Sequence, residues 1–150
     1  MKIAFRKMCW FNPIDLIIAL FSCGTYTHVE IVFSDGSAYS SAPFEGTRYK
    51  NILFDDSWKV IDIHVSDEHE KIIRSFCTRE IGFGYDWWGT LSFGVPWLHQ
   101  KETKWFCTEV IIAAFQKANY LTCLDRCKTS PSSLERHISA NGLSCRKYME

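Results

Sequence analysis

The chain has 150 residues, of which 47% are hydrophobic and 15% are aromatic. That apolar content can supply a core, so the composition excludes a disordered chain and fits one domain spanning residues 1–150. Seventeen basic side chains balance seventeen acidic ones. The zero net charge argues against a nucleic-acid partner, because dedicated nucleic-acid binders usually carry a basic excess.

The N-terminal segment carries positive charge and then a short apolar stretch over Ile14–Phe21. This stretch is too short to cross a bilayer, which takes about 20 residues. No small-residue cleavage pattern follows it, so we expect neither a signal peptide nor a transmembrane segment. We predict instead that Leu16–Phe21 forms a strand buried on both faces, and we expect a cytoplasmic protein.

The next part of the chain alternates between apolar and polar residues, as half-buried strands do. Ser34-Asp35-Gly36-Ser37 is typical of a hairpin turn, because Asp-Gly tolerates a left-handed backbone. The alternation predicts strands over Thr27–Phe33, Ala38–Ser41, Arg48–Phe54 and Trp58–Val65.

After Val65 the hydrophobic period lengthens to that of helices. Ser66 is a good N-cap for a helix that ends near Glu80. Strands come first and helices second, so the predicted fold class is α+β. The other predicted helices are a short aromatic one over Tyr85–Phe93 with Asp86 as a cap, an apolar one over Phe106–Ala118, and one that starts at Ser130-Pro131.

Seven cysteines are scattered along the chain, and an odd, scattered set is a poor disulfide framework. We therefore expect most of them to be reduced thiols. Cys123, Cys127 and Cys145 are the nearest approach to a zinc motif, but no histidine stands at ligand spacing beside them. We predict no metal and no cofactor, and keep a small metal-binding protein built on these three cysteines as an alternative.

Two residues suggest chemistry. Cys107 lies at the predicted start of a helix, where free N–H groups and the helix dipole favour a thiolate. His28 lies near the start of its strand on the same face as Glu30, and an imidazole on a rigid strand can act as a general base. Each also has a plainer interpretation, since free cysteines are often buried in cores and strand histidines are often only hydrogen-bonded.

Five short motifs in order make the chain resemble the circularly permuted branch of the NlpC-type, papain-like cysteine hydrolase superfamily. That branch includes the lecithin:retinol acyltransferase family. The resemblance implies an antiparallel sheet packed on helices, with N-terminal strands followed by C-terminal helices. The motifs span roughly Asp15 to Ile138 and are Asp15–Ala19, Thr27–Val32, Gly84–Asp86, Phe106–Val110 and Ser130–Leu134.

The resemblance implies that Cys107 is the nucleophile and His28 its base. Related families carry a polar residue, often histidine, about twelve residues after the catalytic histidine, and here that position is Ser40. A serine cannot stabilise an imidazolium as a carboxylate can. Ser41, Glu30 or Glu45 could take its place.

We therefore expect a cysteine hydrolase that cleaves a peptide, another amide or an acyl ester through a thioester intermediate. Glu30, Tyr85 and Trp105 are the predicted substrate-binding residues, and Glu30 could instead tune His28. A phage-encoded or intracellular enzyme fits the expected lack of a signal peptide and an anchor. The rival hypothesis is an inactive binding module on the same fold, because Ser40 is a weak third residue. The oligomeric state is left open.

Overall fold

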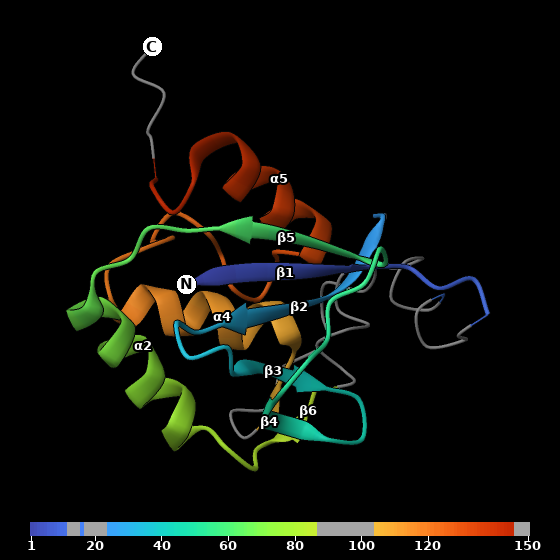
Figure 1. The fold of residues 1–150 in the computed structure, drawn as a ribbon, viewed down its shortest axis with the longest axis horizontal. Coiled ribbons are helices and arrows are strands. Elements are labelled where there is room, and N and C mark those ends of the chain that lie inside the picture. The colour runs from blue at the N-terminus through green and yellow to red at the C-terminus, as the bar shows by residue number, and fades with distance from the viewer. Residues whose placement is uncertain (12–15, 17–23, 87–103, 146–150) are drawn as a thin grey trace.

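The computed structural model describes residues 1–11, 16, 24–86 and 104–145 (Figure 1). These residues form an α+β fold with a five-stranded antiparallel sheet in the order β4-β3-β2-β1-β5. A second, two-stranded sheet pairs β6 with β7 in parallel. The elements are β1 (Lys2–Lys7), β2 (Tyr26–Val32), β3 (Ala38–Ala42), β4 (Gly46–Lys50), β5 (Trp58–Asp62), α2 (Asp67–Arg79), β6 (Gly84–Tyr85), β7 (Lys104–Trp105), α4 (Cys107–Lys117) and α5 (Pro131–Asn141).

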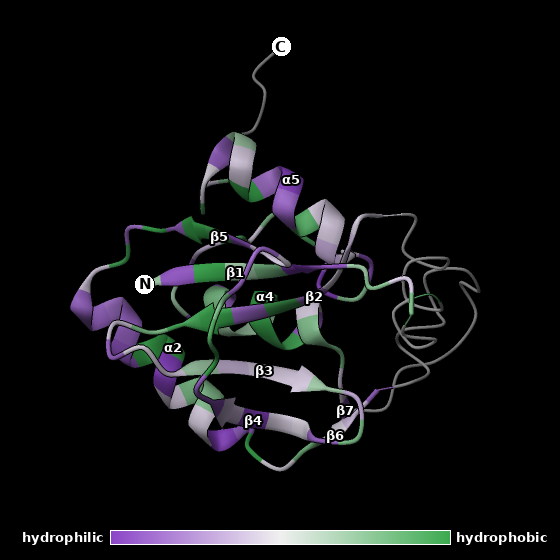
Figure 2. Cartoon of the chain, turned by 45° about the vertical axis from the view of Figure 1, so that its right-hand side comes forward, coloured by the Kyte–Doolittle hydropathy of each residue, from purple (hydrophilic) through white to green (hydrophobic). Residues whose placement is uncertain are grey.

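The core lies between the large sheet and its helices. In Figure 1 helix α4 lies behind β1 and β2, α2 lies to the left of β3 and β4, and α5 lies beside β5. Apolar side chains on one face of the strands pack against α4. In Figure 2 the green stretches mark hydrophobic residues on β1, β2 and α4. The largest fully buried side chains include Ile3, Phe5, Ile31, Tyr39, Ile111 and Phe115. Burial of this apolar area is the main term that stabilises the fold.

Helix α4 is buried along most of its length, including the residue at its start. All residues from Cys107 to Phe115 are buried. At its N-terminus the backbone N–H of Phe106 donates to the carboxylate of Glu109 at 3.5 Å. This contact satisfies a backbone donor at the helix start and fixes the turn that carries Cys107.

The predicted strands and hairpin are confirmed with small changes at their ends. The β2–β3 turn has Gly36 at φ +85°, and the N–H of Ser37 donates to the side chain of Asp35 at 3.0 Å. Residues 51–54 lie outside β4 and residues 63–65 lie outside β5, so these two predicted strands are shorter than expected. The predicted helices at Ser66 and Ser130 are also confirmed, and each serine hydroxyl caps its helix.

Two predictions are wrong at the residues that the structure describes. Leu16 is helical and partly exposed rather than part of a buried strand, and residues 17–21 lie outside the described residues. Tyr85 ends strand β6 rather than starting a helix, since it pairs with Trp105 of β7; residues 87–93 of that predicted helix lie outside the described residues.

Strand β1 was not predicted, although it is central in the sheet. Its sequence alternates, with Ile3 and Phe5 buried in the core and Arg6 on the other face. That alternation is a strand signal.

Most of the described cysteines are free, as expected, but a disulfide joins Cys123 and Cys145, which the sequence did not indicate. It also removes the zinc alternative, since two of its three ligands are bonded to each other. Their spacing in sequence gives no hint of the pair; α5 brings the second cysteine back to the loop after α4. Cys9, Cys77, Cys107 and Cys127 are free, and Cys23 lies outside the described residues.

Among the helices that the structure describes, none is both long and apolar enough to cross a membrane.

Candidate active site

The turn before α4 is tied to two strands, so the position of Cys107 is well defined. The carbonyl oxygen of Trp105 accepts hydrogen bonds from the hydroxyl of Ser41 at 2.7 Å and from the N–H of Asp86 at 3.1 Å. The Trp105 indole donates to Glu80 at 2.9 Å. Cys107 follows at the first position of α4 and is only 1% exposed. Its thiol therefore lies at the positive end of a fixed helix.

His28 projects from β2 and interacts with that thiol. Its side chain is 13% exposed, and its Nε2 lies 2.9 Å from Oε1 of Glu30. Burial alone would lower the pKa of His28, but hydrogen bonds and charge attraction to Cys107 and Glu30 raise it to about 9. At neutral pH His28 is therefore an imidazolium between a sulfur and a carboxylate.

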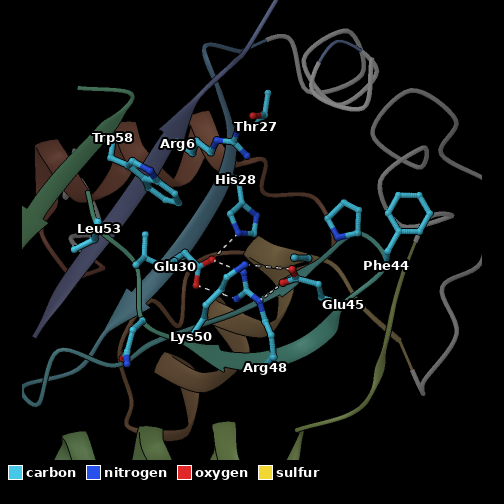
Figure 3. A pocket seen from close by; sticks show the side chains of 14 residues that line it. Arg6, Thr27, His28, Glu30, Phe44, Glu45, Arg48, Lys50, Leu53 and Trp58 are labelled. Carbon is cyan, nitrogen blue, oxygen red and sulfur yellow. Dashed lines mark hydrogen bonds and ion pairs between the residues drawn. The ribbon is translucent and has the colours of Figure 1, made fainter. Parts of the chain in front are cut away.

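Glu30 is a buried carboxylate with two cationic partners. Its side chain is 1% exposed. Arg48 donates to both of its oxygens, at 2.8 Å from Nη2 and 3.1 Å from Nη1, and His28 faces Oε1 (Figure 3). Burial works to raise the pKa of Glu30, but His28 and Arg48 outweigh it and hold the pKa below its usual value. The carboxylate therefore stays charged beside the imidazolium.

The four residues considered as the third member of the site have different hydrogen-bond partners in the structure. Ser40 donates to the carbonyl of Val29 at 2.7 Å, and Ser41 donates to that of Trp105. Glu45 pairs with Arg48 at 2.7 Å and with Lys50. Of these residues, Glu30 is the one whose side chain meets the His28 ring. It does so because residues two apart on a strand share a face.

Two predicted substrate-binding residues lie in the core. Tyr85 packs edge-on to Phe106, and Trp105 packs edge-on to Phe76. Both are buried, and neither lines the pocket described next. Trp87, Trp88 and Trp97 lie outside the described residues.

A pocket of about 490 Å³ opens beside His28 and Glu30 (Figure 3). Its polar side chains include Arg6 and Arg48, and its apolar ones include Trp58. Sequence reasoning missed these three residues. The sequence could have pointed to Arg6 and Arg48, because each is a basic residue in a strand whose opposite face is buried.

A second buried carboxyl group lies under the start of α4. Glu109 is 6% exposed, and burial is the main cause that raises its pKa to about 7. It accepts from the Phe106 N–H, and the thiol of Cys127 lies 3.8 Å from it. At neutral pH this group is only partly ionised, which limits the negative charge it places near Cys107.

Neither the protein-family models nor the curated proteins searched contain a match to this chain. Within the described ranges, no three His, Cys, Asp or Glu side chains are grouped as metal ligands would be. The arrangement that the structure does bring together is a thiol at a helix start, an imidazole and a buried carboxylate. That combination suits nucleophilic catalysis.

Proposed function

We propose that the protein is a cysteine hydrolase of the permuted papain-like kind, acting on an amide or an ester. The observation that carries the proposal is a chain of polar contacts. Cys107 contacts His28, His28 contacts Glu30, and Arg48 holds Glu30. Nucleophile, base and orienting group within reach of one another are the mark of such sites. Peptide, other amide and acyl-ester substrates all fit this chemistry, and the proposed location is the cytoplasm.

The reaction starts from a thiolate on Cys107 and an imidazolium on His28. The sulfur attacks the substrate carbonyl carbon, and the backbone N–H of Cys107 is the default donor to the oxyanion that forms. As the tetrahedral intermediate collapses, the bond to the leaving group breaks and His28 gives that group its proton. The product of this half-reaction is a thioester on Cys107.

Water then completes the cycle. As the water oxygen attacks the thioester carbonyl, neutral His28 removes a proton from the water. The sulfur leaves as a thiolate, the acid is released, and His28 is again an imidazolium. Glu30 stabilises that charged form in both halves, and Arg48 keeps the carboxylate in place, so the weak third residue expected at Ser40 is not needed.

A burst experiment tests the proposal. Mixing the protein with p-nitrophenyl acetate should release one equivalent of p-nitrophenol rapidly, with one acetyl group added to Cys107 by mass spectrometry. The Cys107→Ala variant should show neither. The Cys77→Ala variant is the matched control, because Cys77 is free and buried on α2.

The inactive binding module predicts a different outcome: no burst and no acetylation of Cys107 in a protein that is folded. Acetylation at another cysteine instead would also overturn the assignment of Cys107 as the nucleophile.

A further inference from the structure

The floor of the pocket follows from the register of the large sheet. Arg6 of β1 lies opposite His28 of β2 on one side and Trp58 of β5 on the other. Directly opposite residues share a face, so these three side chains form a row. The next row along β1 has Ala4 between Glu30 and Val60. Ala4 is buried under apolar side chains that include Phe54 and Trp58, so the pocket lies over the Arg6 row.

Positive charge exceeds negative charge in this pocket. Its lining holds the cations Arg6, His28, Arg48 and Lys50, with two carboxylates. Those carboxylates, Glu30 and Glu45, are engaged by His28, Arg48 and Lys50.

Arg6 is the cation left over. Within the described ranges no carboxylate forms an ion pair with it. The Asp55 carboxylate accepts its hydrogen bonds from Ser57, which lower the pKa of Asp55, and the charge of Arg6 adds to this effect. An arginine in a central strand opposite an imidazolium is unfavourable unless an anion joins it, because like charges directly across a sheet repel.

Apolar surface adjoins this cation. The Trp58 ring lies edge-on to His28 with 6.3 Å between ring centroids. Leu53 and Phe44 also line the pocket and are 97% and 85% exposed. Figure 3 shows Trp58 and Leu53 on one side of His28 and Phe44 on the other. A ligand that combines an anion with an apolar group would cover both kinds of surface.

We propose that this pocket selects acyl substrates carrying a carboxylate, which pairs with Arg6, and an apolar group, which packs against Trp58. The proposal rests on the proposed function, because His28 joins this pocket to Cys107. A planar guanidinium pairs with one carboxylate through two parallel hydrogen bonds, and its single charge balances that of the carboxylate. Arg6 is then a specificity residue rather than a catalytic one.

Two alkylating agents of nearly equal size test the charge preference. Iodoacetate carries a carboxylate and iodoacetamide is neutral, and each alkylates a thiolate at the same carbon. The rates at Cys107 are divided by the rates with glutathione in the same solution. The ratio of the iodoacetate to the iodoacetamide value then cancels changes in thiolate content.

Arg6→Gln should lower this ratio about tenfold, which corresponds to roughly 1.4 kcal/mol. Arg6→Lys should keep most of it, because the charge remains. Arg79→Gln removes an exposed cation from α2 and should leave the ratio unchanged. An equal ratio in wild type and Arg6→Gln overturns the proposal.

A binding measurement separates this proposal from the proposed function. In the Cys107→Ala variant, 4-phenylbutyrate should shift the indole N–H signal of Trp58 in NMR titrations at lower concentration than 4-phenylbutyramide does. No preference for the carboxylate overturns the pocket proposal even if Cys107 is reactive. A clear preference with an inert Cys107 in the wild type overturns the hydrolase and leaves an anion-binding pocket.

Discussion

At the residue scale, the site depends on the position of one carboxylate. Glu30 lies two residues after His28, so a single strand supplies both the imidazole and the group that orients it. The raised pKa of His28, about 9, makes the imidazolium the main form at neutral pH. That form is the one needed to protonate a leaving group.

Activity should therefore fall as the pH rises through about 9, where His28 loses its proton. Glu30→Gln removes a charge that favours the imidazolium, so the pKa of His28 falls and this alkaline limb moves to lower pH by about one unit or more. The measurement is the pH profile of the first turnover with an acyl p-nitroanilide, whose leaving amine must take a proton from His28.

Ser40→Ala is the matched control, because the Ser40 hydroxyl donates to a backbone carbonyl rather than to His28. Its alkaline limb should stay at the wild-type pH. A limb that moves in Ser40→Ala but not in Glu30→Gln would return the third role to Ser40.

At the scale of elements, β4 holds Arg48 in place, and β4 begins at a glycine that the structure requires. Gly46 has φ +67°, and a Cβ added there would lie 2.3 Å from the carbonyl oxygen of Phe83. The same carbonyl accepts the N–H of Thr47 at 2.9 Å. Close backbone packing between β4 and the residues before β6 thus fixes the position of β4, the strand whose Arg48 pairs with Glu30.

Gly46→Ala should lower the free energy of unfolding by about 2 kcal/mol or more, because it adds a steric clash to the cost of a left-handed backbone. Gly36→Ala isolates the second cost: Gly36 has φ +85°, but nothing lies within 4 Å of an added Cβ. Its loss should be about 1–2 kcal/mol. Urea unfolding of both variants compares them, and equal losses would contradict the close approach to Phe83.

At the scale of the whole molecule, the Cys123–Cys145 disulfide ties the chain after α5 to the loop after α4. A cross-link stabilises mainly by restricting the unfolded chain. Disulfides persist in oxidising surroundings and are rare in the cytosol, so the bond conflicts with the cytoplasmic location that we propose. The redox state of this disulfide in the native cell therefore tests the proposed location.

Cys145→Ser should lower the free energy of unfolding by about 3 kcal/mol in the oxidised protein, the value expected for a closed loop of this length. Thermal unfolding with and without dithiothreitol measures the effect. In the reduced protein the variant should match the wild type. A variant as stable as the oxidised wild type would show that the cross-link contributes nothing.

The sequence predicts much of this fold because its strands and helices carry local signals. The alternation in Thr27–Phe33, the Asp-Gly turn and the Ser130-Pro131 helix start each appear in the structure. The disulfide has no local signal, since its two cysteines meet only through the packing of α5.

The candidate site divides in the same way. Cys107 and His28 stand at element ends, where the sequence itself suggests a role for them. Ser40 was chosen by counting residues from His28, but the count does not reveal that its hydroxyl turns to the Val29 carbonyl. Arg48 reaches Glu30 from β4, two strands away, so its role requires the sheet order.

The most direct test of the account is the rate of iodoacetamide labelling at each cysteine of the native protein between pH 5 and 9, read by mass spectrometry. We predict that Cys107 reacts faster than Cys9 at low pH, because the proposed pairing with His28 favours the thiolate, and that His28→Ala abolishes this advantage. A Cys107 that is inert, or no faster than the other free cysteines, would contradict the hydrolase.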